Sequence, residues 1–457
     1  MKKNSHTIKE GAMPFKRILI ANRGEIALRI IRACKEMGIE TIAVYSDADK
    51  DSLPVKAADH AVHIGPALSY KSYLNLDRIM AAIKEAKADA VHPGYGFLSE
   101  NADFAKACED MGITFIGPSA ECIARSGNKS SARRTLTDLG IPVIPGSLDI
   151  LTSPDTACAL AETVGFPVIL KASGGGGGRG MRIAHNPKEL REAFSMASGE
   201  AKAAFGNPDI YLEKYIEKPR HIEIQILGDK FGRYVHLAER ECSIQKRYQK
   251  LIEEAPSSFV DDDLRAALGN AAVTIARAIG YTNAGTIEFL VDKDKKFYFM
   301  EVNARVQVEH PVTEMITGID IVRQQILIAD GQKLTLKQED IIPNGWAMEC
   351  RINASDPEDN FMPCPGRIES IVFPGGPGVR IDTHIHDGYM VGPFYDSLIG
   401  KLIVWDQDRP SAIRRMKRAL DEFDIRGIQT TIPFFRKIFL NKKFQKGDID
   451  THFLDNL

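Results

Sequence analysis

The stretch FMEVNARVQVEHPVT, residues 299–313, decides how the fold of the remaining chain is interpreted. Its polar residues at every second position are Glu301, Asn303, Arg305, Gln307 and Glu309. In an extended strand successive side chains point to opposite faces, so these five groups would share one face. The simpler interpretation is a solvent-exposed edge strand. Two carboxylates, two amides and a guanidinium on one face instead favour a reaction site.

The length of the chain predicts two or three packed units, because 457 residues exceed what one hydrophobic core normally serves. A formal net charge of -2 argues against nucleic acid as the main partner. The seven cysteines lack CxxC spacing, which favours reduced thiols in a cytoplasm over disulfides or a zinc site. No apolar run is long enough to span a membrane. Residues 1–14 are expected to form a disordered extension.

Residues 16–46 alternate between strand and helix patterns, which predicts a parallel α/β layer. The loop after the first strand reads NRGE and lacks the glycine fingerprint of a dinucleotide site, so a nicotinamide cofactor is disfavoured. Further units follow, with a helix near 76–86 and the strand DAVH. The next loop, PGYGFLSEN, carries Tyr95 and Glu100 at the carboxyl end of that strand, where open α/β sheets usually bind ligands.

A small separate α/β unit is predicted over about 143–216. Its strand FPVILKA runs into SGGGGGRGMRI, and a helix is expected after Pro187. A flexible linker is the commoner interpretation of a glycine run. The flanking apolar strands, together with Arg179 and Arg182, favour instead a hairpin loop whose N–H groups fold over phosphates. Lys171, just upstream, would supply a positive charge for the same anion.

A hairpin is predicted from TIEFLV, the turn DKDKK and FYFMEVN. If Val291 pairs with Tyr298, Glu288 lies opposite Glu301 on the same face. Facing carboxylates repel unless a cation lies between them, although a pair exposed to water could tolerate the repulsion. With Asn303 adjacent, we expect Mg²⁺ or Mn²⁺ shared with a nucleotide, because these ions prefer oxygen ligands.

Six motifs together resemble the biotin carboxylases. They are ILIANRGEIALRI, HPGYGFLSEN, KASGGGGGRGMR, EVNARVQVEHPVTEMITG, ECRINAS and YDSLIGK. The likeness runs from about residue 15 to about residue 455. It implies a fold of the α/β and α+β classes with ATP-grasp architecture. The expected parts are an N-terminal parallel α/β domain over 15–128, a linker helix and small mobile lid over 129–216, and a C-terminal mixed-sheet catalytic domain over 217–457.

The resemblance also implies site residues. Contacts to ATP would come from Lys129, Lys171, Gly177, Gly178, Glu213, Lys214, Ile216, His221, Gln245 and Glu288. Two Mg²⁺ or Mn²⁺ ions would be held by Glu288, Glu301 and Asn303. Bicarbonate would contact Lys250, Arg305, Gln307, Val308 and Glu309. Glu309 would be the general base, while Tyr95 and Arg351 would border biotin, with Arg351 stabilising its enolate. Tyr248 stands where the family commonly has a His, which puts a nucleotide contact there in doubt.

The activity implied by the resemblance is that of an ATP-dependent ligase that carboxylates biotin through carboxyphosphate. Expected partners are a separate biotin carboxyl carrier protein, a carboxyltransferase and a second copy of the chain, in the cytoplasm. The acceptor (acetyl-CoA, pyruvate or another acyl-CoA) is chosen by these partners. One alternative is another bicarbonate-activating ATP-grasp ligase, such as half of a carbamoyl phosphate synthetase. The other is a non-catalytic ATP-binding regulatory protein, which would require losses among the working residues named above.

Overall fold

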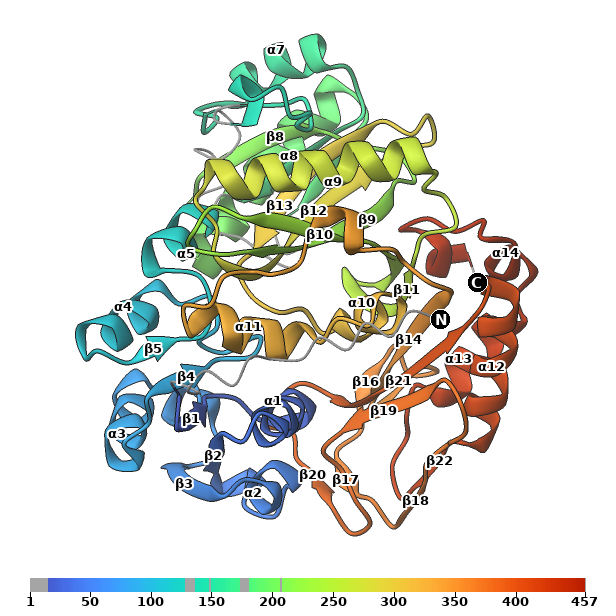
Figure 1. Ribbon diagram of the computed structural model, residues 1–457. Coiled ribbons are helices and arrows are strands. Elements are labelled where there is room, and N and C mark those ends of the chain that lie inside the picture. Colours follow the sequence, from blue (N-terminus) through green and yellow to red (C-terminus); the bar gives the residue numbers. More distant parts are fainter. Residues whose placement is uncertain (1–14, 128–135, 148, 173–180, 206–207, 457) are drawn as a thin grey trace.

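Three main sheets organise the computed structural model of the chain, which describes residues 15–127, 136–147, 149–172, 181–205 and 208–456 (Figure 1). The predicted extension 1–14, the predicted helix start at Lys129 and the glycine run at 174–178 lie outside these residues. Within the described part of the chain, no helix combines the length and the apolar character needed to cross a membrane.

The first sheet is parallel and follows the predicted alternation of strands and helices near the N-terminus. In spatial order its strands are β3 (His60–Gly65), β2 (Glu40–Ser46), β1 (Arg17–Ile20), β4 (Ala90–His92) and β5 (Thr114–Phe115). The accompanying helices are α1 (Gly24–Glu36), α2 (Leu53–Ala57), α3 (Leu76–Ala86), α4 (Ala102–Asp110) and α5 (Ala120–Gly127). β1 lies in the middle, and its apolar residues are buried as a run without alternation predicts.

The second sheet is small and antiparallel, with the order β7 (Arg182–Ala184), β6 (Val168–Ala172) and β8 (Ile210–Lys214). Helices α7 (Pro154–Val164) and α8 (Pro187–Phe205) pack on each other and share an alanine-rich core with these strands. β6 and β7 pair on either side of the glycine run, so the predicted hairpin is confirmed.

The third sheet has eight strands whose neighbours all pair antiparallel. Its order is β13 (Phe297–Asn303), β12 (Asn283–Val291), β9 (Arg220–Gly228), β10 (Tyr234–Lys246), β11 (Gln249–Ala255), β14 (Trp346–Asn353), β21 (Leu398–Asp406) and β19 (Val379–Thr383). Its helices are α9 (Asp262–Ala278), α10 (His310–Thr317), α11 (Ile321–Ala329), α12 (Arg409–Glu422), α13 (Ile432–Leu440) and α14 (Lys442–Lys446). α10 packs on β10, β11, β14 and β21, which are neighbours near the middle of the sheet.

Short elements complete the chain. The two-stranded pairs are β15 (Ser355–Asp356) with β16 (Met362–Pro363), β17 (Gly366–Arg367) with β20 (Met390–Val391), and β18 (Ser370–Val372) with β22 (Asp424–Arg426). Single 3₁₀ turns lie at Asp47–Asp49, Ser69–Lys71, Gln338–Asp340 and Phe453–Asn456. In Figure 1 the first sheet and the region containing β17 and β20 lie at the same end of the molecule.

The hairpin β12–β13 brings the two predicted carboxylates together by a register that differs from the prediction. Val291 pairs with Phe297, not with Tyr298. A β-bulge further along the hairpin then shifts the pairing by one residue. Glu288 consequently lies opposite Glu301, as predicted. The predicted pairing of the strand ends was wrong, but the pairing that matters for the site is confirmed.

The polar alternation of residues 301–309 does not lie on one strand. β13 ends at Asn303, an irregular turn follows, and α10 begins at His310 with Glu309 as its N-terminal cap residue. The prediction of one extended face through Glu309 is therefore wrong. Pro311 supplies a physical reason, because proline lacks the N–H that a strand ladder needs and is favoured in the first turn of a helix.

Candidate active site

Lys250 joins three carboxylates in a buried cluster at the third sheet. Its Nζ donates to Glu223 at 2.6 Å, Glu309 at 2.7 Å and Glu288 at 2.9 Å. These partners come from β9, the cap of α10 and β12, whereas Lys250 lies on β11. Burial alone would lower the pKa of Lys250, but the carboxylates outweigh it and raise that pKa well above its usual value. Lys250 is therefore a fixed positive charge at the centre of the site.

Glu309 has no exposed surface and is held by two cations. Lys250 contacts its Oε1, and Nη2 of Arg351 donates to its Oε2 at 2.9 Å. Burial would raise the pKa of Glu309, but Lys250, Arg351 and Arg240 outweigh burial and hold it well below its usual value. Glu309 is thus ionised at neutral pH, which is the form that a general base requires.

Arg305 lies in the turn after β13 and is anchored to the N-terminal part of the chain. Its Nε donates to Glu100 at 2.9 Å, and Glu100 also accepts from the backbone N–H of Ala304 at 2.9 Å. Nη1 donates to Gln307 at 2.8 Å, and Nη2 donates to Asn303 at 3.2 Å. A guanidinium fixed in this way presents planar donors to a small anion with little loss of side-chain freedom.

Glu288, Glu301 and Asn303 present oxygen atoms that suit a divalent ion. Glu288 faces Glu301 across the hairpin, and Asn303, two residues after Glu301 on β13, has its Oδ1 3.2 Å from Nη2 of Arg305. His221 contacts Glu288 at 2.9 Å in addition to Lys250. Burial would raise the pKa of Glu288, but these two neighbours outweigh it and lower that pKa. Two facing carboxyl groups, one of them held ionised, beside an amide fit Mg²⁺ or Mn²⁺.

The second sheet carries further residues that the family resemblance assigns to ATP. Nζ of Lys171 donates to Glu213 at 2.5 Å. Lys214 donates to two backbone carbonyls of the loop before β6, at 2.7 and 3.0 Å, and Ile216 is half-buried just after β8. The predicted ATP residues outside the described part of the chain are Lys129, Gly177 and Gly178.

Gln245 and His221 lie together beside the carboxylate cluster. Nε2 of Gln245 is 2.7 Å from Nδ1 of His221, and the other ring nitrogen of His221 contacts Glu288. Tyr248 lies at the tip of the β10–β11 hairpin with φ +64 and is 60% exposed. The structure therefore brings Gln245 into contact with His221 of the cluster, whereas the Tyr248 side chain is mostly exposed to solvent.

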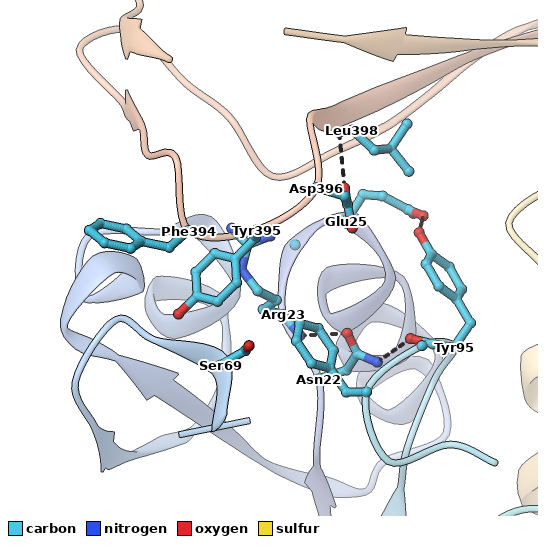
Figure 2. Close-up of a pocket in the computed structure, with 12 residues that line it drawn as sticks. Asn22, Arg23, Glu25, Ser69, Tyr95, Phe394, Tyr395, Asp396 and Leu398 are labelled. Carbon is cyan, nitrogen blue, oxygen red and sulfur yellow. Dashed lines mark hydrogen bonds between the residues drawn. The ribbon is translucent and has the colours of Figure 1, made fainter. Parts of the chain in front are cut away.

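A cavity of about 340 Å³ lies beside Tyr95, and Figure 2 shows the residues that line it. The Tyr95 hydroxyl donates to Glu25, and Nζ of Lys401 lies 3.1 Å from Glu25. Lys401 also donates to the backbone carbonyl of Val308 at 2.8 Å. The cavity wall is thus linked to the turn that carries Gln307 and Glu309. The lining residues are Asn22, Arg23, Gly24, Glu25, Ser69, Tyr95, Gly96, Phe97, Phe394, Tyr395, Asp396 and Leu398.

Sequence reasoning missed Glu223, Arg240 and Glu253. Glu223 accepts from Lys250 and from Nε of Arg240, and its carboxylate, His221 and Glu288 bring ligand atoms within 4.8 Å of one another. The strand HIEIQIL places alternate polar residues on one face in the way that drew attention to residues 301–309, so Glu223 could have been found. Arg240 and Glu253 have no such signal, because they lie in runs of consecutive polar residues, ERECS and EE, where no alternation singles them out.

Family models match almost the whole chain. The N-terminal domain of biotin carboxylase matches residues 14–123 and its C-terminal domain matches residues 349–456. The model for the ATP-binding domain of the carbamoyl-phosphate synthase L chain matches residues 128–337 between them. The N- and C-terminal matches distinguish this chain from proteins that share only the ATP-binding domain with it.

Curated relatives and solved structures agree with these matches. The chain is 54% identical to biotin carboxylase 1 of Bacillus subtilis over 96% of this chain and 98% of that protein. It is 56% identical to a biotin carboxylase of Nostoc over 97% of this chain and 100% of that protein. A complex of biotin carboxylase and β,γ-ATP from Campylobacter jejuni superposes with a TM-score of 0.94 at 50% identity, over 97% of this chain and 99% of that one. The predicted fold class is confirmed.

Proposed function

We propose that this chain, which belongs to the biotin carboxylase family, is an ATP-dependent ligase that carboxylates biotin on a carrier protein with bicarbonate. The observation that carries the proposal is the cluster in which Lys250 and Arg351 both hold the buried, ionised Glu309. A structure of the biotin carboxylase domain of the Hydrogenobacter thermophilus 2-oxoglutarate carboxylase, with MgADP and bicarbonate bound, has a TM-score of 0.92 and 49% identity over 97% of each chain.

Bicarbonate binding is assigned to the turn after β13. Arg305, Gln307, the backbone of Val308 and Lys250 would supply donors to its oxygen atoms, with Arg305 oriented by its contact to Glu100. Bicarbonate becomes an effective nucleophile only when its remaining proton is removed. Glu309 would accept that proton, since it is ionised and enclosed by the same side chains.

ATP binding is assigned to the second sheet and the facing edge of the third. The ammonium of Lys171 and the glycine loop would contact phosphates, and Glu288, Glu301 and Asn303 would hold Mg²⁺ or Mn²⁺. When bound, such ions neutralise the charge of the phosphates during transfer. The protein's own part is to orient the phosphoryl group toward bicarbonate and to exclude water, because carboxyphosphate hydrolyses easily.

Biotin is assigned to the side of Arg351 and Tyr95. The guanidinium of Arg351 is anchored at Nε by Glu253 and at Nη2 by Glu309, so its remaining donors would offset the negative charge of the biotin enolate. The cavity beside Tyr95 would admit the tethered biotin from the surface. Carbon dioxide released in the enclosed site would then meet the enolate.

Purified protein tests the proposal by steady-state ADP release with and without bicarbonate and free biotin. We expect ATP cleavage to depend on bicarbonate and to rise with biotin. ADP release that does not change when both are omitted would refute the carboxylase activity. A nitrogen donor that stimulates cleavage in place of biotin would instead indicate a synthetase of the carbamoyl phosphate type.

The assembly and the division of the chain form part of the same proposal. The boundaries 15–128, 129–216 and 217–457 each contain one of the three main sheets. A relative from Methanothermobacter, 51% identical over 96% of this chain and 90% of that protein, is named as one of the subunits of a pyruvate carboxylase, which supports a separate carrier and carboxyltransferase. A homodimer is supported by the Hydrogenobacter structure, which is described as a dimer. A cytoplasmic location agrees with seven free cysteines.

A further inference from the structure

Two glutamates face each other behind Arg351. Glu253 on β11 pairs in register with Glu349 on β14, and both side chains have no exposed surface. Facing residues of an antiparallel pair have their Cβ atoms about 5 Å apart, so the two carboxyl groups are direct neighbours. Arg351 follows two residues after Glu349 on the same face of the same strand. The pair therefore lies next to the guanidinium that is assigned to biotin.

The hydrogen bonds of this pair are incomplete. Oε1 of Glu253 accepts from Nε of Arg351 at 2.6 Å. Oε2 of Glu253 and both oxygen atoms of Glu349 are buried and have no partner among the described residues. A buried carboxylate without a hydrogen bond is costly, so three such atoms on two residues in register require an explanation.

The charges around Glu349 do not provide a partner either. The charged groups that face it are Lys401 from β21, Arg351 from its own strand, Glu253 from β11 and Glu309 from the cap of α10. The ammonium of Lys401 is already directed at Glu25 and at the carbonyl of Val308. Two carboxylates this close cannot both be ionised at low cost, and one proton between them resolves the repulsion.

We propose that Glu349 keeps a proton and donates it in a hydrogen bond to Oε2 of Glu253, so that the pair positions Arg351. One bond of this kind satisfies Glu253 Oε2 and one oxygen atom of Glu349 together. It completes a chain from Glu349 through Glu253 and Arg351 to Glu309. Glu253 and Glu349 are positioning residues, since neither is assigned a contact with substrate. The effect of this pair on biotin-dependent turnover rests on the proposed function.

The direction of the titrations agrees with this arrangement. Burial raises the pKa of Glu349 well above its usual value, and Glu253 and Glu309 add to the effect against Lys401 and Arg351. Burial also raises the pKa of Glu253, to about 7, although Arg351 opposes the change. Glu253 accepts from the guanidinium of Arg351 and Glu349 has no such contact among the described residues, so the shared proton is placed on Glu349.

The pair gives Arg351 an anchor that survives the reaction. When Glu309 accepts the bicarbonate proton it loses its charge, and its hold on Nη2 of Arg351 weakens. Glu253 still accepts from Nε of Arg351 at that moment, and the hydrogen bond donated by Glu349 favours the ionised form of Glu253. Arg351 then stays directed at the biotin oxygen.

The test compares four variants in biotin-dependent ATP cleavage over a range of pH. Glu349→Gln keeps a hydrogen-bond donor for Glu253 but cannot ionise, whereas Glu349→Met removes the donor at similar volume. Glu253→Gln removes the anionic anchor of Arg351. The matched control is Glu254→Gln, because Glu254 is the next residue on β11, is buried and pairs with Arg409 on the opposite face.

The expected pattern follows from the hydrogen bond. Glu253→Gln should lower kcat with biotin by up to about 100-fold, the cost of an ångström-scale misplacement, and leave KM for ATP unchanged. Glu349→Met should also lower kcat with biotin, whereas Glu349→Gln should leave kcat unchanged at neutral pH. As pH rises through the raised pKa of Glu349, the wild type should lose kcat, and Glu349→Gln should not. Full turnover of Glu253→Gln, or the same loss with rising pH in Glu349→Gln, would overturn the proposal.

A stability measurement keeps this inference separate from the proposed function. The folded-state pKa of Glu349 lies above the value in the unfolded chain, so the folded wild type binds more protons and loses stability as pH rises from about 4.3. The Tm of Glu349→Gln minus that of the wild type should therefore increase with pH. A difference independent of pH overturns the shared proton, whatever the enzyme assay shows. Absence of any biotin-dependent turnover in the wild type refutes the proposed function alone.

Discussion

Replacing Glu309 by Gln should abolish biotin-dependent turnover and leave nucleotide affinity almost unchanged. A positioned general base contributes roughly 100- to 10,000-fold to a rate, and Gln cannot accept the bicarbonate proton. The same change weakens two charge-assisted hydrogen bonds, to Lys250 and Arg351. Lys250 keeps Glu223 and Glu288, and Arg351 keeps Glu253, so neither cation is left without a partner. We therefore expect a stability loss of only about 1.5–3 kcal/mol.

The assay is steady-state ADP release with saturating bicarbonate and biotin, together with calorimetric titration of the nucleotide. The matched control is Glu314→Gln. Glu314 is buried in the same helix, α10, and contacts Arg29 at 2.9 Å and Arg380 at 2.7 Å, outside the candidate site. The control should lose stability by a similar amount and keep its kcat. Retained biotin-dependent turnover in Glu309→Gln would remove Glu309 as the base.

Three further outcomes are expected. Lys401→Met should destabilise the fold by about 3–5 kcal/mol in urea unfolding, because it leaves Glu25 buried without its cation, and a loss below about 1 kcal/mol would contradict this. Burial lowers the pKa of His92 and of His384 to about 3. As pH drops below about 6.5, these histidines therefore bind protons in the unfolded chain before they do so in the folded chain. The free energy of unfolding should then fall by about 1.4 kcal/mol per pH unit for each histidine. His384→Gln should reduce that slope, and an unchanged slope would exclude His384 as a source. A chelator should stop ATP cleavage, and added Mg²⁺ or Mn²⁺ should restore it. Glu301→Gln should raise the metal concentration required for ATP cleavage by roughly tenfold or more. An unchanged metal requirement in this variant would exclude Glu301 as a ligand.

Much of the fold could be predicted because it depends on local patterns. The parallel first sheet, the hairpin around the glycine run and the helix near 76–86 follow from apolar periodicity and from turn residues in short segments. The facing pair Glu288 and Glu301 was also predicted, although from a register that is one residue off at the strand ends. The bulge that restores the pairing changes the backbone without a signal in the residue types.

The candidate site was predicted only as a set of residues, since its arrangement depends on side chains from distant strands. Residues 301–309 were expected on one strand, whereas the chain passes from strand to turn to helix within them. Lys250 was identified through the family resemblance, but its contacts to three carboxylates could not be. Glu253 and Glu349 were not identified at all, because nothing in the sequence shows that β11 and β14 are neighbours.

The amino-acid sequence is enough to predict the family, the order of helices and strands and the residue types available for metal, bicarbonate and proton transfer. These properties depend on contiguous motifs and on short-range alternation of polar and apolar residues. The charge states of the same residues depend on the folded chain. The pKa of a carboxyl group depends on its burial and on charges a few ångströms away, and those charges come from strands far apart in the chain. Glu309 is ionised, and Glu349 keeps its proton in our proposal, because of which side chains surround each of them.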